Sequence, residues 1–218
     1  MVQLELDHIF VFVDLAETKA GGGVFECLAA LGLRPSFERR HAGQGTANLC
    51  YAFDNAYLEL LFVADEDELK ASPLNRACFT ARSSWRKTGA SPFGIACRGM
   101  LPGESWAYRN PDFPPGVSID ISAESFDAAT PFLFSSPGKA PPSAWNDERA
   151  GQRQAAAGFA NLTIERLTLP KRPLPAGALD GFHRAGLVGA LEIADGEPEM
   201  LIGFGSGVRL CLPLFTAA

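Results

Sequence analysis

The feature that most constrains this chain is a hairpin, predicted over residues 41–63 by the run HAGQGTANLCYAFDNAYLELLFV. Its first strand is Asn48–Phe53, its second and more apolar strand is Ala56–Val63, and the letters DN between them are turn residues. Alternation along the second strand places Tyr57 and Glu59 on the same face. A carboxylate buried in an apolar strand without a partner is costly, so we expect Glu59 to have a partner or to bind a metal.

A second strand with a polar interruption is predicted near the N-terminus, over Leu4–Val13. His8, Phe10 and Phe12 share one of its faces, and because both faces are otherwise apolar the strand should be covered on both sides. A lone histidine in such a strand is most simply a core residue bonded to backbone. Together with Glu59 it suggests a shared site, and both interpretations stay open.

The order of predicted elements repeats along the chain, which indicates an α+β fold built from β-α-β-β-β modules. We divide the sequence into a first module (1–65), a connection with a partial second module (66–137), a surface linker (138–158) and a C-terminal β-α-β-β-β module (159–218). Within this division, the C-terminal module is expected to pair with another copy to close a core.

The middle of the chain carries two more specific expectations. Residues 102–109 are predicted to form one short helix. The basic residues Arg82, Arg86 and Lys87 are predicted to form a solvated face of the connection that precedes it.

Composition excludes several classes of function. The chain has 218 residues, 47% hydrophobic and 20% charged, and its formal net charge of −6 provides no basic footprint for nucleic acid or an anionic membrane. Its five cysteines are scattered without a CxxC pair, which is typical of free thiols in a reducing compartment. The sequence lacks a signal peptide pattern and a membrane-length apolar run, so we expect a cytoplasmic protein.

Three motifs together resemble a known superfamily. They are the opening LDHIFVFVD, the run H-x-G-x-GT-x-N and the closing strand YLELL. This combination resembles the glyoxalase-like branch of the vicinal oxygen chelate superfamily, which includes glyoxalase I, extradiol dioxygenases, methylmalonyl-CoA epimerase and bleomycin resistance proteins. The match is strongest over residues 4–63 and weak over the last sixty residues.

The resemblance implies a fold and a chemistry. The fold is one of paired modules whose curved mixed sheets enclose a cavity. In metal-dependent members a divalent ion in that cavity binds two neighbouring substrate oxygens, and its ligands come from the first and last strands of modules. His8 matches the first-strand position and Glu59 the last-strand position. These ligand types suit Zn, Mn, Fe or Ni and do not choose among them.

The sequence departs from this pattern in its last module. The counterpart of His8 falls near 159–163, which contains no histidine, and the counterpart of Glu59 falls near 210–212, which contains no carboxylate. Most catalytic metal sites need three protein ligands. His41 could complete a His8, His41 and Glu59 set, bind a substrate oxygen directly, or be an exposed loop residue.

The resemblance implies two functions that have a small molecule as the partner, beside a third in which the fold is a degenerate scaffold for protein association. One is a metal-dependent lyase, isomerase or dioxygenase in which Glu59 is a ligand or general base and His41 a ligand or acid–base group. The other is a metal-free binding protein of the resistance type, with ligand contacts from Phe10, Phe12 and Tyr57. Asn48 is a cap or a polar cavity group in either case. A homodimer stays open, because many members pair modules between chains.

Overall fold

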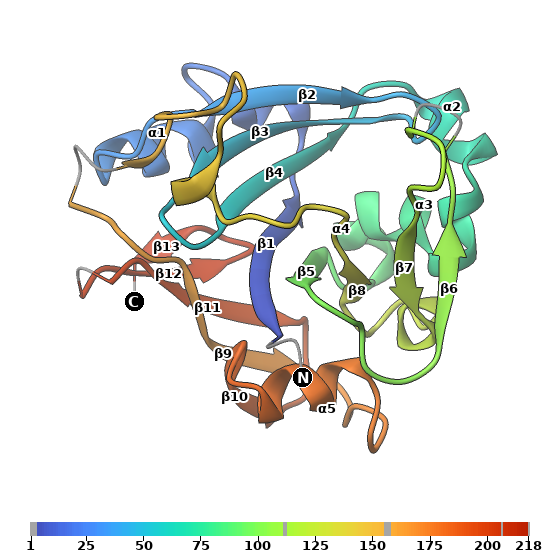
Figure 1. The fold of residues 1–218 in the computed structure, drawn as a ribbon. Helices are drawn as coiled ribbons and strands as arrows, with labels where there is room; N and C mark the ends of the chain where they lie inside the picture. The colour runs from blue at the N-terminus through green and yellow to red at the C-terminus, as the bar shows by residue number, and fades with distance from the viewer. Residues whose placement is uncertain (1–3, 111–112, 155–157, 206, 218) are drawn as a thin grey trace.

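The computed structural model describes residues 4–110, 113–154, 158–205 and 207–217, which form two β-sheets with short helices (Figure 1). The strands of the larger sheet are β1 (Glu5–Phe12), β2 (Phe37–His41), β3 (Thr46–Ala52), β4 (Tyr57–Val63), β5 (Phe93–Arg98), β6 (Ser105–Tyr108), β7 (Ile119–Ser122) and β8 (Phe132–Ser135). Those of the smaller sheet are β9 (Thr163–Leu169), β10 (Val188–Ile193), β11 (Glu199–Gly203), β12 (Arg209–Leu212) and β13 (Thr216–Ala217).

The helices connect these strands. The α-helices are α1 (Gly23–Ala30), α2 (Glu66–Ala71), α3 (Phe79–Ser83), α4 (Trp85–Thr88) and α5 (Ala178–Arg184), and the 3-10 turns are η1 (Leu15–Thr18), η2 (Pro73–Ala77), η3 (Ala123–Phe126) and η4 (Pro142–Ala144). Across the described parts of the chain, no helix has the length and apolarity needed to cross a membrane. All five cysteines are free thiols.

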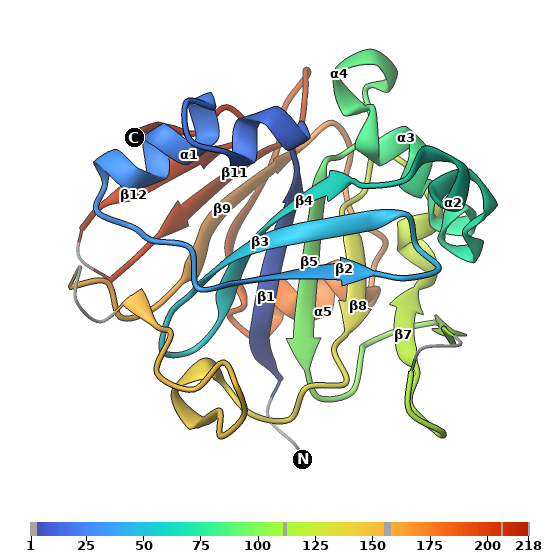
Figure 2. The ribbon, with the colours of Figure 1, turned by 90° about the horizontal axis from the view of Figure 1, so that it is seen from above.

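The larger sheet contains two modules side by side. Its strand order is β2-β3-β4-β1-β5-β8-β7-β6, with β1 parallel to β4 in one half and β5 parallel to β8 in the other. The antiparallel pair β1 and β5 joins the halves at the centre of the sheet (Figure 2). The second half has no helix between its first two strands, and residues 105–108 form a strand paired with β7 rather than the predicted helix. The aromatic residues of this SWAY segment favour a strand.

The C-terminal unit has the predicted order of elements but another topology. Its sheet order is β10-β9-β11-β12-β13, and β9 is parallel to its direct neighbour β10. The helix α5 therefore returns the chain to the strand next to β9, whereas α1 carries it to the far edge of the first module. Because β1 pairs with β5 in the larger sheet, the module that shares the curved sheet with the first is the partial second one and not the C-terminal one (Figure 1).

The alternation predicted for the central strands is confirmed. Ile9 and Val11 of β1 lie in a core shared with α1 and the C-terminal unit, while Phe10 and Phe12 lie in a second core on the other face of the sheet. In β4, Leu58 and its neighbours at alternate positions join the first core. The opposite face of β4 carries Tyr57, Glu59 and Leu61, which line a cavity.

The segment expected as a surface linker is tied to the first module. Ser143 N–H donates to the carbonyl of Asp54 (3.1 Å), and the Arg153 guanidinium pairs with the Asp54 carboxylate. The buried Gln154 side chain accepts from the N–H of Arg34 (2.9 Å) and donates to its carbonyl (2.6 Å). These bonds hold the segment against the edge of the sheet near β2.

The glycines of the H-x-G-x-GT-x-N run are backbone requirements, and Gly45 is the stricter one. Its φ is +72°, and a Cβ there would overlap the backbone nitrogen of Leu69 and the carbonyl oxygen of Asp65. We expect Gly45→Ala to lower the free energy of unfolding by about 3 kcal/mol, measured by urea denaturation. Gly89 has a φ of +70° but open space around it, so Gly89→Ala should cost only about 1 kcal/mol. Equal losses for the two variants would contradict this account.

Candidate functional site

A cavity of about 960 Å³ lies on the inner face of the curved sheet, opposite the core shared with the C-terminal unit. Six of the seven side chains proposed from the sequence line it: His8, Phe10, His41, Asn48, Tyr57 and Glu59. The seventh, Phe12, is 1% exposed and does not line the cavity. Its ring packs edge-on against Phe10 (5.6 Å) and Phe79 (5.2 Å), because α3 covers this end of β1.

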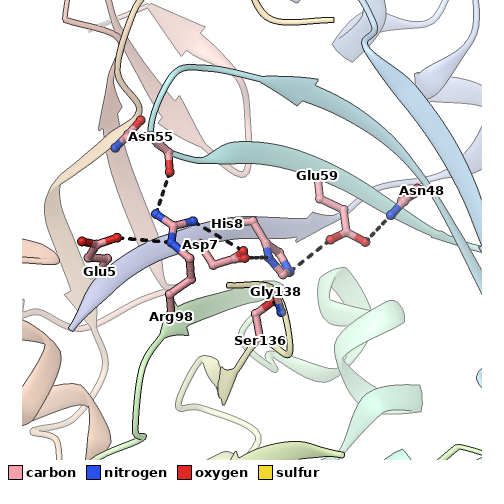
Figure 3. Close-up of polar contacts among 9 residues, drawn as sticks. All are labelled: Glu5, Asp7, His8, Asn48, Asn55, Glu59, Arg98, Ser136 and Gly138. Carbon is pink, nitrogen blue, oxygen red and sulfur yellow. Dashed lines mark hydrogen bonds and ion pairs between the residues drawn. The ribbon is translucent and has the colours of Figure 1, made fainter. Parts of the chain in front are cut away.

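Glu59 has the partners that its buried position requires. The carboxylate is 5% exposed and accepts a hydrogen bond from Asn48 Nδ2 at 2.8 Å. His8 Nε2 lies 3.4 Å from its other oxygen (Figure 3). The parallel pairing of β1 with β4 brings these strands together, and β3 supplies Asn48 from the other side of β4. The structure therefore brings His8 and Glu59 together, and a functional site shared by the two stays a prediction.

His41 belongs to the same polar group. It lies at the end of β2 opposite Thr46, whose hydroxyl is 3.0 Å from His41 Nδ1. His41 Nε2 is 3.2 Å from Asn48 Nδ2 and 3.9 Å from the nearer Glu59 oxygen. The Asn48 amide thus touches both the His41 ring and the Glu59 carboxylate, which leaves His41 as the outer member of the group.

The pKa of His41 is lowered from 6.5 by burial, against the opposing effect of the Glu59 charge. Below about pH 6.5 the unfolded chain then binds more protons at this ring than the folded chain does. The stability that neutral His41 contributes is complete above that pH and declines as the pH falls. We expect the difference in unfolding free energy between the natural protein and His41→Gln to be larger at about pH 7.5 than at about pH 5.5, measured by urea denaturation. The same comparison for His183→Gln, at an exposed histidine, is the control. An equal difference for His41→Gln at both pH values would contradict the prediction.

Asp7 is a site residue that the sequence analysis missed. The register of β1 against β5 shifts between Leu6 and His8, so Asp7 is an extra residue in the strand. It lines the cavity beside His8, although strict alternation would place it on the opposite face. Its Oδ2 atom is 3.7 Å from His8 Nδ1, and its Oδ1 atom is 3.6 Å from Arg98 Nη1 (Figure 3). A bulge of this kind leaves no signal in a period-two pattern. The only sequence signal for Asp7 is its position directly before His8.

Aromatic rings surround the polar group. The Tyr57 ring stacks on His8 with centroids 4.4 Å apart, and Phe134 meets His8 edge-on at 5.2 Å. Trp145, from the segment after β8, packs edge-on against Phe37 at 5.6 Å and lies 6.0 Å from Tyr57. Burial raises the pKa of Tyr57 well above 10, so its phenol stays neutral at physiological pH.

The three predicted ligands do not converge on one point. Among the residues that the structure describes, no group of three or more His, Cys, Asp or Glu side chains is placed to hold a metal ion. The Asn48 amide lies between His41 and Glu59, and the second module presents phenylalanine to the cavity: Ala96 pairs with His8, and Phe134 pairs with Ala96. The donor set therefore does not fit a metal held by three protein ligands, and metal binding stays a prediction from resemblance.

Comparisons with known proteins agree with the motifs of the first module. Residues 6–104 match the model of a family described as a glyoxalase-like domain, a range that includes His8, His41, Asn48 and Glu59. No curated protein matches the chain. One solved structure that aligns with it is the crystal structure of a hypothetical protein from Staphylococcus aureus, at 14% identity and a TM-score of 0.43, over 93% of this chain and 82% of that one.

Proposed function

We propose that this chain, whose residues 6–104 match the model of a glyoxalase-like domain, is a lyase or isomerase that uses Glu59 as a general base on a small oxygenated substrate. The observation that carries the proposal is the placement of Glu59. It is a buried carboxylate that lines a cavity and is held by Asn48 and His8. A carboxylate fixed in this way is suited to accept a proton from a bound molecule.

The roles of the other polar groups follow from their positions. Glu59 takes a proton from a carbon next to a carbonyl group, and the electron pair of that C–H bond moves into the enolate. In an isomerase the proton then returns to the former carbonyl carbon, while the proton of the neighbouring hydroxyl group passes to the former carbonyl oxygen. In a lyase the electron pair of the enolate instead expels a leaving group from the carbon beta to the carbonyl. Asn48 and His8 keep the carboxylate in place, and His41 binds a substrate oxygen at the outer edge of the group. An iron-dependent dioxygenase needs three converging protein ligands, and among the residues that the structure describes no three His, Cys, Asp or Glu side chains are placed in that way.

A non-catalytic binding protein is the second candidate. It is favoured by the aromatic wall of the second module, where Phe132 and Phe134 line the cavity in place of polar groups. In that case Glu59 and His8 are a buried polar pair that anchors a ligand. The cavity volume of about 960 Å³ suits a ligand of drug-like size.

Deuterium exchange distinguishes the two candidates. The protein is incubated in D₂O with hydroxyacetone or 2-hydroxyacetophenone, and loss of the proton next to the carbonyl is followed by NMR. Ligand binding is measured in parallel by thermal shift. The enzyme proposal predicts exchange above the buffer rate. A thermal shift without exchange would instead support the binding protein, and neither effect with any compound of this class would contradict both.

A further inference from the structure

The rings around the polar group form a continuous series, which we call the aromatic arc: Trp145, Tyr57, Phe134, Phe132 and Phe10. We propose that the arc selects substrates with an aromatic ring, so that the natural substrate is an aryl compound with one oxygenated edge. This inference deepens the proposed function by naming the substrate class.

Ring contacts connect the arc through the polar group. Centroid distances are 6.0 Å from Trp145 to Tyr57 and 4.4 Å from Tyr57 to His8. From His8 the series continues to Phe134 at 5.2 Å. It then runs to Phe132 at 5.2 Å and from there to Phe10 at 5.7 Å. Because each ring contacts the next, with His8 as the link between Tyr57 and Phe134, the arc is a rigid surface and needs little ordering when a ligand binds.

The cavity has its buried polar group on the wall of the first module, beside the Tyr57 and Phe10 rings of that module. Its first-module wall carries Glu59 and Asn48, whereas β8 in the second module contributes Phe132 and Phe134. A ligand that satisfies both walls has hydrogen-bonding oxygens on one edge and an apolar body on the other. This division sets the orientation of the ligand as well as its composition.

Aromatic side chains favour an aromatic ligand over an aliphatic one of equal size. Ring pairs in offset-stacked or edge-to-face arrangements gain free energy beyond what the buried area provides. Beside the polar group, Tyr57 stacks on the His8 ring and Phe134 meets that ring edge-on. In the segment after β8, the Arg149 guanidinium stacks over Trp145 at 4.1 Å and helps to hold that ring.

A matched pair of probes tests the inference. 2-Hydroxyacetophenone and cyclohexyl hydroxymethyl ketone share the polar edge and differ in the ring. Their dissociation constants are measured by calorimetry for the natural protein and for Trp145→Leu and Phe134→Leu, which keep an apolar side chain but remove the ring. Trp106→Leu is the control, because Trp106 lies in β6 outside the cavity lining.

We expect the natural protein to bind the aryl probe more tightly than the cyclohexyl probe. Each arc variant should reduce that ratio roughly threefold to tenfold, and the Trp106→Leu control should preserve it. Equal affinity for the two probes, an unchanged ratio in both arc variants, or no binding of the aryl probe at millimolar concentration would overturn the inference.

Measuring the ratio in Glu59→Gln as well separates this inference from the proposed function. If Glu59→Gln keeps the affinity ratio of the aryl and cyclohexyl probes and the natural protein shows no deuterium exchange, the proposed role of Glu59 as a base is wrong and the aromatic selectivity stands. If the natural protein shows deuterium exchange but no preference for the aryl probe, the role of Glu59 as a base stands and the aromatic selectivity is wrong.

Discussion

Glu59→Gln is expected to lower the rate of deuterium exchange by about 10²- to 10⁴-fold, the range that a positioned general base contributes. Glutamine has the shape of glutamate, and its carbonyl oxygen can still accept the 2.8 Å hydrogen bond from Asn48. The variant should therefore keep its fold and lose only the proton acceptor. The measurement is the exchange rate by NMR, with the melting temperature recorded on the same sample.

Glu38→Gln is the matched control for this variant. Glu38 also lines the cavity, but it is an exposed residue of β2. Among the described residues, no hydrogen bond or ion pair joins its side chain to His8 or Asn48. We expect its exchange rate to stay within about twofold of the natural protein, because a carboxylate outside the polar group is not positioned to take the proton. A Glu59→Gln variant that retains the natural rate, or an equal loss in Glu38→Gln, would refute the assignment of Glu59 as the base.

Arg82→Met is expected to lower the free energy of unfolding by about 3–5 kcal/mol. Contrary to the predicted solvated face, Arg82 is fully buried in α3, and burial lowers its pKa to about 10, so it stays charged at neutral pH. Its guanidinium donates to six backbone carbonyls: those of Ala77, Ser91, Ser125, Asp127, Ala128 and Thr130.

The size of this effect follows from the kind of acceptor. A buried ion pair can be replaced by apolar residues at little cost when both partners are removed. The acceptors of Arg82 belong to the backbone and cannot be removed, so methionine would leave several buried carbonyls without a donor. Arg86→Met makes the same substitution at a half-exposed residue that pairs with Asp14 and Glu17, and it should cost less than about 1 kcal/mol. Similar losses for both variants in urea denaturation would contradict this explanation.

The sequence was sufficient to predict the elements whose pattern is local. The hairpin alternates with period two, and that period places Tyr57 and Glu59 together on the face that lines the cavity. The same rule separates His8 and Phe10 from Ile9 in β1. These predictions depend only on which way successive side chains point, and the sheet preserves that direction.

The features that the sequence did not predict depend on distant parts of the chain. The bulge at Asp7 arises from the register with β5, which no single strand encodes. Arg82 is buried because a loop far along the chain folds its carbonyls around the guanidinium. The second module lacks the helix typical of the repeat, so the order of predicted elements points to the C-terminal unit as the partner of the first module. The polar composition of residues 138–158 indicated a linker, but Trp145 packs against Phe37 at the cavity.

In the proposed mechanism, Glu59 acts as a base held by Asn48 and His8, without a metal bound by three protein ligands. The most direct test is to measure deuterium exchange on protein treated with a chelator, with the Zn, Mn, Fe and Ni content of the same sample determined by elemental mass spectrometry. We predict exchange at the untreated rate in metal-depleted protein, and its loss in Glu59→Gln. Exchange that disappears on chelation and returns with near-stoichiometric metal would contradict this account and restore the metal site that the resemblance implies.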